Sequence, residues 1–480
     1  MNNTMTIFDY LYPKYKITKP IRLIEFFAGY GSQALALKYL GVPFEHWKIC
    51  EWAVKSIQAY KDIHFENESA ILVGLNKEQE VERLYKQGIS SNYNEPMTKE
   101  QINRLSYQQI YDITANNLIT HNLVNIKNVK GQDLEIVDTD KYDYILTYSF
   151  PCQDLSLAGK GKGMSDTSTR SGMLWEVERI LTECHELGTL PQILLMENVP
   201  QVHSQDNLDD FNKWKLRLEE LGYKNYFRDL IATDYGIPQT RNRCFMISIL
   251  GDYSYTFPKP IPLEKKLKDL LENNVDEKYY LSDKQIKDIQ SWNAYEKPLE
   301  TIDKDISKTL TTRIGAYCSG MQLVKDNMKS KLCNKLIEQC KVKENDVIRH
   351  SYTTSRNENW DKRNVEQNNL SPTLDTRCDC LRVCVGTYQF AKSDNFMQGR
   401  DRLQLGKEVS DTLQTSQKEG IVNSNLRIRK LTPRECFRLM GVKDEDYEKC
   451  AKNQSDSSLY HLAGDSIVCQ CLMAIFKELL

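Results

Sequence analysis

A cysteine and a glutamate each follow an apolar segment of this chain, and together they could carry out nucleophilic chemistry. The tripeptide Pro-Cys-Gln at 151–153 ends the apolar run at 144–150, and Glu197 ends the run at 193–196. Both runs are short, which predicts buried strands. Because open α/β sheets collect functional groups at the carboxyl ends of their strands, we expect Cys152 and Glu197 to be neighbours. A nucleophile would then lie beside a group that can handle protons.

A glycine-rich turn near the start of the chain is a second candidate site. The predicted strand at 21–27 leads into Gly29-x-Gly31-x-x-Ala34 and then into a helical pattern, and Glu51 follows about twenty residues later. In such a fingerprint the glycines let a ligand approach the backbone and the acid binds ribose hydroxyls. The pattern alone suits a nicotinamide cofactor and S-adenosylmethionine equally, and a tight turn without a ligand is a further alternative.

The cysteine distinguishes these cofactors. Hydride transfer needs no cysteine, whereas methylation at C5 of a pyrimidine does, because C5 becomes nucleophilic only after a thiolate adds at C6. Glu197 would hydrogen-bond the ring N3 and the exocyclic amine of cytosine. Arg241 and Arg243 alternate along an extended segment, so they would face one side and bind the cytosine carbonyl and a phosphate. The structural alternatives are a cap or salt bridge for Glu197 and solvated surface for the arginines.

Composition predicts an ordinary globular protein. The 480 residues are 40% hydrophobic and 27% charged, and we find no apolar stretch near the roughly 18 residues of a membrane span. The polar start of the chain resembles no signal peptide, so we expect a cytoplasmic protein without membrane contact. Fourteen scattered cysteines indicate reduced thiols. The net charge of −2 gives no bulk support for nucleic-acid binding, so the basic cluster at 427–438 is either a local DNA surface or a solvated face.

Alternation of strand and helix patterns predicts an α/β fold with a doubly wound, Rossmann-like parallel sheet. We expect a catalytic domain at 1–254 with a helical insertion at about 65–127, a smaller lobe of strands and irregular structure at 255–425, and a segment at 426–480 that completes the catalytic domain. In the smaller lobe the phrase Ser-x-Thr-Leu-x-Thr occurs three times, either as scaffold or with hydroxyls that reach DNA. The cysteines at 378–384 lack paired ligand spacing, so no metal site is expected.

The motifs, in this order along the chain, resemble those of the bacterial and phage DNA (cytosine-5)-methyltransferases. The resemblance rests on segments 27–31, 149–156, 197–200, 239–243 and 464–467. It implies S-adenosylmethionine as cofactor, double-stranded DNA as substrate, and a target base flipped out of the duplex onto the cysteine. It implies cofactor contacts at Phe27, Gly29, Tyr30, Gly31, Glu51, Trp52, Asp133, Leu134, Pro151, Asp465 and Ser466, and catalytic roles for Cys152, Gln153, Glu197, Arg241 and Arg243.

The chain departs from the family pattern at three places. Ser32 stands where a second glycine is usual, Asp465 stands where asparagine is usual, and the insertion at about 65–127 lengthens the path between motifs. The insertion is either a surface elaboration or a partner site. The smaller lobe occupies the place of the family's target recognition domain. We further expect a monomer, with a cognate restriction endonuclease as a possible partner.

Three other functions compete with this interpretation. A tRNA cytosine-5 methyltransferase has the same architecture, but the long recognition region favours duplex DNA. A thymidylate-synthase-like enzyme also uses a Pro-Cys thiol, but the glycine turn and Glu51 do not suit folate. A DNA-binding protein without activity is the third, and the presence of Cys152, Glu197 and Arg243 disfavours it.

Overall fold

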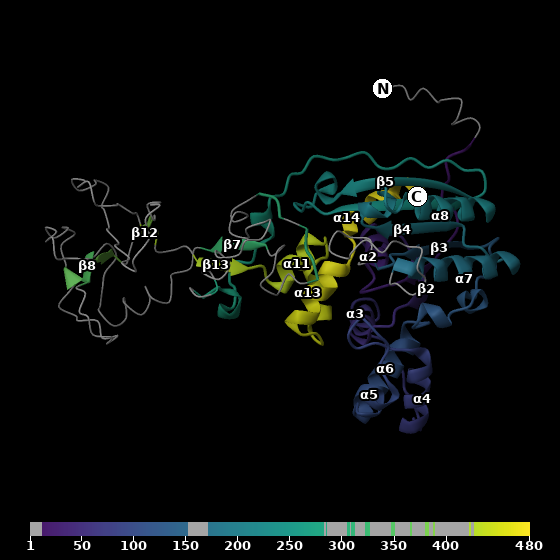
Figure 1. Cartoon of the computed structure of the whole chain (residues 1–480), viewed down its shortest axis with the longest axis horizontal. Coiled ribbons are helices and arrows are strands. Elements are labelled where there is room, and N and C mark those ends of the chain that lie inside the picture. The colour runs from purple at the N-terminus through teal and green to yellow at the C-terminus, as the bar shows by residue number, and fades with distance from the viewer. Residues whose placement is uncertain are drawn as a thin grey trace. The chain divides into compact units, whose positions relative to one another are not determined.

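The chain forms two compact units in a computed structural model (Figure 1). The first unit comprises Met1–Val275, Asn293–Gln322 and Leu431–Leu480, and the second comprises Asp276–Trp292 and Leu323–Lys430. The structure describes residues 12–151, 171–282, 285, 305–307, 309–312, 322–326, 347–350, 365–366, 380–383, 387–388, 422–423 and 427–480. Residues 255–275 and 293–322, which the sequence analysis placed in the smaller lobe, group with the first unit.

A six-stranded sheet in the order β2-β1-β3-β4-β6-β5 forms the centre of the first unit. Its strands are β1 (Ile21–Phe26), β2 (Phe44–Cys50), β3 (Asp143–Tyr148), β4 (Ile193–Asn198), β5 (Tyr223–Ile231) and β6 (Asn242–Leu250). All residues of β1, β3 and β4 are buried, as expected for a sheet covered on both faces. The predicted α/β, Rossmann-like fold is confirmed.

One strand runs against the predicted direction. β1 to β4 pair in parallel, but β6 is antiparallel to both β4 and β5. The expectation of a wholly parallel sheet is therefore wrong at this edge. Residues 232–241, which join β5 to β6, contain only the short 3₁₀ helix η5 (Ala232–Tyr235), and a parallel crossover needs a dozen or more residues.

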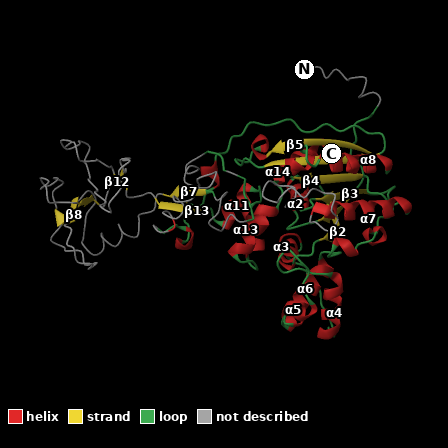
Figure 2. Cartoon of the chain, viewed as in Figure 1, coloured by secondary structure: helices red, strands yellow, loops and turns green. Residues whose placement is uncertain are grey.

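Helices cover both faces of the sheet (Figure 2). On one face, α7 (Leu174–Glu186) and α8 (Leu208–Glu220) contribute to the main hydrophobic core, in which Trp214 is fully buried. On the other face, α2 (Ser32–Tyr39) and α3 (Val54–His64) lie against β1. The buried carboxylate of Glu25 on β1 accepts hydrogen bonds there from the Ala34 amide at 3.3 Å and the Tyr60 hydroxyl at 2.5 Å.

Three helices occupy the region of the expected insertion, between β2 and β3: α4 (Lys77–Gln87), α5 (Lys99–Asn103) and α6 (Tyr107–Ile119). They lie together in Figures 1 and 2 and bury a small core of their own that includes Val81, Leu84, Ile102, Ile110 and Ile113. Capping boxes begin both α5 and α6, where Thr98 and Ser106 accept hydrogen bonds from backbone amides. The segment thus has its own helix-start signals and its own hydrophobic interior.

The C-terminal part of the chain returns to the first unit as α11 (Pro433–Leu439), α12 (Asp444–Ala451), α13 (Asp456–Asp465) and α14 (Cys469–Leu479). The stretch 456–479 is long and apolar enough to span a membrane by composition alone, which the sequence analysis had not recognised. In the structure it is two helices separated at Ser466–Val468, and 67% of its most apolar window is buried inside the protein. Such burial is typical of a core helix.

The second unit contains short strands. β7 (Leu323–Asp326) pairs with β13 (Arg427–Lys430), β8 (Val347–His350) lies between β9 (Val365–Glu366) and β10 (Cys380–Val383), and β11 (Thr387–Tyr388) pairs with β12 (Val422–Asn423). All of these pairings are antiparallel. Of the three Ser-x-Thr-Leu-x-Thr phrases, the one at 307–312 belongs to the first unit and is described except at residue 308. The phrases at 371–376 and 410–415 and the cysteine at 378 lie outside the described residues.

Candidate active site

The glycine turn after β1 is shaped by left-handed backbone and by close packing. Phe27, Gly29 and Gly31 have φ of 57°, 55° and 83°, and Gly31 caps the N-terminus of α2. A Cβ atom at Gly31 would lie 2.4 Å from Nε2 of His64 and 2.6 Å from the ring of Tyr60. Glycine is therefore required at this position for two independent reasons, conformation and space.

Glu51 lies directly beside this turn. The Gly29 amide donates to its Oε2 at 3.0 Å and the Ala53 amide donates to its Oε1 at 2.8 Å. The side chain follows β2, whose last residue, Cys50, accepts a hydrogen bond from the Phe27 amide through its carbonyl oxygen. Burial raises the pKa of Glu51 to about 7, although both backbone hydrogen bonds favour its ionised form. The structure thus brings together the two parts of the predicted fingerprint.

The other residues expected at the cofactor lie in several surroundings. Tyr30 is 1% exposed, stacks on Phe437, and donates its hydroxyl proton to Oγ of Ser466 at 2.8 Å. Asp133 and Leu134 lie on η2 (Gly131–Leu134), where the Asp133 carboxylate accepts from the Lys130 amide. Trp52 packs against the core of the three-helix insertion. No contact of these residues with a ligand is part of the structure, so their cofactor roles stay predictions.

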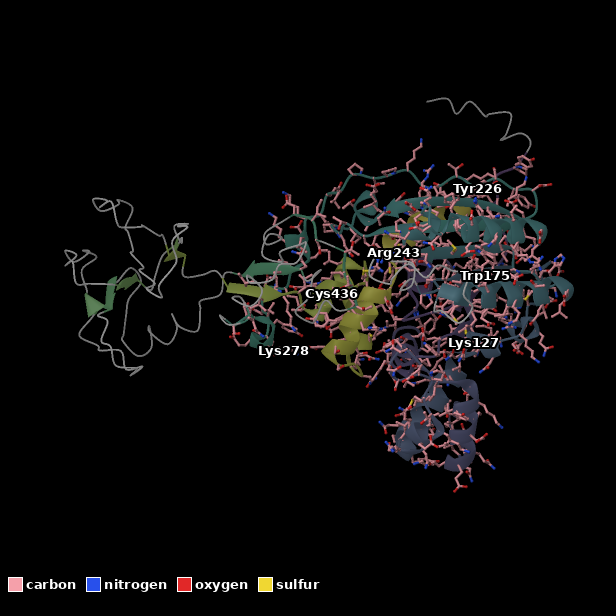
Figure 3. The ribbon with its side chains drawn as sticks, viewed as in Figure 1. Lys127, Trp175, Tyr226, Arg243, Lys278 and Cys436 are labelled. Carbon is pink, nitrogen blue, oxygen red and sulfur yellow. The ribbon has the colours of Figure 1, made fainter. Side chains whose placement is uncertain are left out.

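Glu197 is a buried acid near the carboxyl end of β4. It is 6% exposed on β4, and Nε of Arg243 on β6 lies 3.1 Å from its Oε1. Arg243 is labelled in Figure 3. Glu197 pairs with Phe245 across the two strands, so Arg243, two residues away, is its diagonal neighbour. Burial raises the pKa of Glu197, while the charges of Arg243 and Arg241 oppose that rise.

Arg241 and Arg243 bind different partners. Arg241 is 3% exposed, and its guanidinium donates to the carbonyl oxygens of Leu310 at 3.0 Å, Gly464 at 3.1 Å and Ser466 at 2.6 Å. These contacts tie the C-terminal Gly-Asp-Ser segment to the start of β6. The assignment of Arg241 to the substrate remains a prediction, and what the structure shows is a role in holding Asp465 and Ser466 in place.

The nucleophile itself is outside the described residues. Cys152 and Gln153 belong to the segment 152–170, so their predicted position beside Glu197 is untested. A hydrogen bond fixes the residues directly before this segment: Asn198 donates from Nδ2 to the Phe150 carbonyl oxygen at 3.0 Å. This bond joins the ends of β3 and β4. The chain therefore enters the cysteine segment at Pro151, next to the residue that follows Glu197.

Sequence reasoning missed two residues that organise this end of the sheet. Asn198 was quoted as part of a motif but given no role. Gln239 is fully buried, donates to the Leu439 carbonyl oxygen at 2.7 Å and accepts from the Leu310 amide at 3.0 Å. The glutamine of the Gln-x-Arg-x-Arg motif was the available signal, but its partners lie 71 and 200 residues away along the chain.

The expected basic cluster provides little free positive charge. In the second unit, Arg429 is 1% exposed. In the first unit, Arg434 forms an ion pair with Glu272 at 3.0 Å, and Nε of Arg438 donates to Asp444 at 2.8 Å. These arginines serve mainly to join chain segments, so neither alternative offered by the sequence, DNA surface or solvated face, describes them fully.

One group of described residues could hold a metal ion, although the sequence suggested none. Ligand atoms of His203, Asp229 and Cys244 lie within 4.8 Å of one another. Nε2 of His203 already lies 2.9 Å from the carboxylate of Asp229, and burial, with the charge of Asp229, raises the pKa of the Cys244 thiol. A His–Asp pair beside a protonated core thiol accounts for this geometry.

Comparison with known proteins decides the family. Residues 86–480 match the model of the C-5 cytosine-specific DNA methylases. Type II methyltransferase M2.ScrFI of Lactococcus lactis subsp. cremoris is 30% identical over 465 residues, which cover 96% of this chain and 99% of the relative. The chain belongs to this family. The resemblance seen in the motifs is confirmed, as is the predicted enzyme class, DNA (cytosine-5)-methyltransferase.

A further relative and a solved structure bear on this chain in different ways. Orphan methyltransferase M.SssI of Spiroplasma monobiae is 36% identical over 272 residues, covering 55% of this chain and 68% of the relative. The crystal structure of S. pombe Dnmt2 methyltransferase superimposes with a TM-score of 0.52 at 14% identity, covering 96% of this chain and 98% of that one. At that identity the structural likeness shows the fold alone.

Proposed function

We propose that this methyltransferase moves a methyl group from S-adenosylmethionine to C5 of a cytosine flipped out of a specific double-stranded DNA sequence, with Cys152 as the nucleophile. The observation that carries the proposal is the ion pair between buried Glu197 and Arg243. Asn198, the residue after Glu197, is hydrogen-bonded to Phe150, directly before Pro151 and Cys152. An acid in this position can protonate or hydrogen-bond the ring as sulfur adds.

The proposed reaction begins at C6 of the cytosine ring. The Cys152 thiolate forms a bond to C6, and Glu197 stabilises the negative charge that develops at N3. S-adenosylmethionine, held beside Glu51 and Gly29, would supply the electrophilic methyl group to C5, with S-adenosylhomocysteine as the leaving group. Loss of the C5 proton to a base and departure of the thiolate restore the aromatic ring. Arg243 can exchange Glu197 for the cytosine carbonyl, because guanidinium donors bind either acceptor.

The residues around Glu51 fit an adenosine-containing cofactor. Each carboxylate oxygen of Glu51 accepts one backbone amide and keeps a further lone pair, which leaves acceptors for two ribose hydroxyls. Gly29 presents a backbone without a side chain, and no heavy atom lies within 4 Å of the place where its Cβ would be. These features support the assignment of the cofactor, with the remaining predicted contacts at Phe27, Tyr30, Gly31, Trp52, Asp133, Leu134, Pro151, Asp465 and Ser466.

The second unit supplies sequence choice in this proposal. It lies between β6 and the C-terminal helices in the chain, the place of the target recognition domain in the family. The enzyme works in the cytoplasm as a monomer, and a restriction endonuclease of the same specificity is its proposed partner. Support comes from the type II name of the relative that matches nearly the whole chain.

The decisive experiment replaces the nucleophile. Cys152→Ala should abolish methyl transfer while DNA affinity persists, because phosphate contacts lie elsewhere. Labelled cofactor would measure transfer to duplex DNA, and bisulfite sequencing of DNA from expressing cells would locate the modified cytosines. Cys152→Ser is the matched control for size, and it should be nearly as inactive because an alcohol is a poor nucleophile at neutral pH.

A mechanism-based trap tests the same step independently. DNA with 5-fluorocytosine at the target should form a covalent complex with the wild-type enzyme, because fluorine cannot leave as a proton does. Duplex with unmodified cytosine is the control. Persistent methylation by the alanine variant, or no trapped complex with an active enzyme, would contradict the role of Cys152.

A further inference from the structure

The loop between α4 and α5 of the insertion is bonded directly to the residues around Glu51. Ser90 is fully buried, and its amide donates to the Trp52 carbonyl oxygen at 2.7 Å. Its own carbonyl oxygen accepts from the Val54 amide at 2.9 Å. Two backbone bonds thus clamp the residues on both sides of Ala53, whose amide donates to Glu51. The insertion therefore fixes the segment that carries the predicted ribose acid.

The same loop also reaches the other end of the predicted cofactor site. The ring of Tyr93 lies 3.9 Å from the ring of His461 on α13, at an interplanar angle of 38°. Nε2 of His461 lies 3.4 Å from the carboxylate of Asp465. Tyr93 thus contacts the residue that neighbours Asp465, the position at which this chain departs from the family's asparagine.

The bonds of its loop hold Tyr93 in this place against backbone strain. Its φ is 64°, in the left-handed region that costs a non-glycine residue on the order of 1–3 kcal/mol. The loop is closed by hydrogen bonds from the Ser90 hydroxyl to the Glu95 carbonyl oxygen and from the Met97 amide to Ile89, both 2.7 Å. Such strain indicates a constraint on where the ring must lie.

The electrostatics agree with this placement. Burial raises the pKa of the Tyr93 hydroxyl, and the charges of Glu51 and Asp465 raise it further. The pKa of Glu51 is in turn raised by the charge of Asp465, in addition to burial. The phenol thus lies within electrostatic reach of both carboxylates that are predicted to bind the cofactor.

We propose that the insertion is a functional part of the cofactor site, in which Tyr93 is a positioning residue that orients Asp465 by packing its ring against His461. This proposal rests on the proposed function, because it takes S-adenosylmethionine as the cofactor. It replaces both alternatives offered by the sequence for the segment at about 65–127, a surface elaboration and a partner site. Ser90 fixes the segment that carries Glu51, and Tyr93 contacts His461, which lies beside Asp465.

Equilibrium binding of S-adenosylhomocysteine, measured by calorimetry without DNA, tests the proposal apart from turnover. Tyr93→Ala should raise the dissociation constant about three- to tenfold, the loss expected for one aromatic contact. Tyr93→Phe keeps the ring and should bind almost as the wild type does. Tyr85→Ala is the matched control, because this tyrosine lies on α4 of the same insertion and is 47% exposed. Melting temperature and DNA affinity should change little in all three.

A double-mutant cycle shows whether Tyr93 acts through His461. His461→Ala should weaken binding of S-adenosylhomocysteine to a similar extent. The double variant should bind it no more weakly than either single variant, because both changes remove the same contact. If Tyr93→Ala does not fold, His461→Ala still tests the contact between Tyr93 and His461. Unchanged binding by the single variants, or fully additive losses, would overturn the proposal. If the wild-type protein binds no S-adenosylhomocysteine, the cofactor assignment fails together with this inference, whereas binding by all variants alike contradicts only the inference.

Discussion

Two buried carboxylates lie at the carboxyl ends of strands of the same sheet, but the protein holds them in different ways. Glu51, after β2, accepts two backbone amides, from Gly29 and Ala53. Glu197, on β4, is paired with the side chain of Arg243. Burial raises the pKa of both groups, and only Glu197 has arginine charges that oppose the rise. One acid is fixed by the main chain and the other by a movable cation.

This difference matches the work proposed for each acid. Backbone amides do not move when a ligand arrives, so Glu51 is a rigid acceptor suited to binding. An arginine side chain can change partners, so Glu197 can gain or lose charge compensation during a reaction. Whether a buried acid suits binding or catalysis therefore depends on the mobility of its partner group and not on burial alone. Three experiments test that distinction.

The largest effect is expected at Glu197. Glu197→Gln should lower the methylation rate by about 10²–10⁴-fold, because an amide cannot supply a proton to the ring nitrogen. Cofactor affinity should change little, since Glu51 and the glycine turn remain. Single-turnover kinetics with saturating cofactor would measure the loss. A rate equal to that of the wild type would place Glu197 among structural residues and remove the contrast with Glu51.

An intermediate effect is expected at the glycine turn. Gly31→Ala should lower the free energy of unfolding by about 2–4 kcal/mol, because it adds left-handed strain and forces the new Cβ against His64. Cofactor binding should weaken in parallel, since Gly29 and Glu51 are joined through this turn. Chemical denaturation would measure the first effect and calorimetry the second. Gly41→Ala is a useful control, because its φ is 70° but no heavy atom lies within 4 Å of the added Cβ.

The smallest effect is a pH dependence of cofactor binding. Folded Glu51 has a pKa of about 7, so it is mostly protonated at pH 6 and mostly ionised at pH 8. A ribose hydroxyl donates more strongly to the ionised form, and binding therefore favours loss of the proton. The affinity for the cofactor should rise up to about tenfold from pH 6 to pH 8, because the ionised fraction of Glu51 falls about tenfold for each pH unit below the pKa. Glu51→Gln should abolish the slope, and a slope that survives in this variant would assign the titration to another group.

Much of the site was predictable because its chemistry restricts the residue types. The pairing of the glycine turn with Glu51 was expected from their spacing, and the hydrogen bond from Gly29 confirms that they lie together. The predicted strands at 144–150 and 193–196 correspond to β3 and β4 within a few residues. The approach of Cys152 to Glu197 was predicted in the same way and stays a prediction.

The sequence by itself determined the family, the α/β class and the positions of the chemically constrained motifs, because each depends on residue types within a short window. Only the tertiary structure decided the antiparallel direction of β6, the carbonyl partners of Arg241, and the contact between Tyr93 and His461. The bonds from Arg241 to Gly464 and Ser466 and the contact of Tyr93 with His461 join residues hundreds of positions apart. No local pattern encodes such pairs, because their partners are chosen by packing of the whole sheet and its helices.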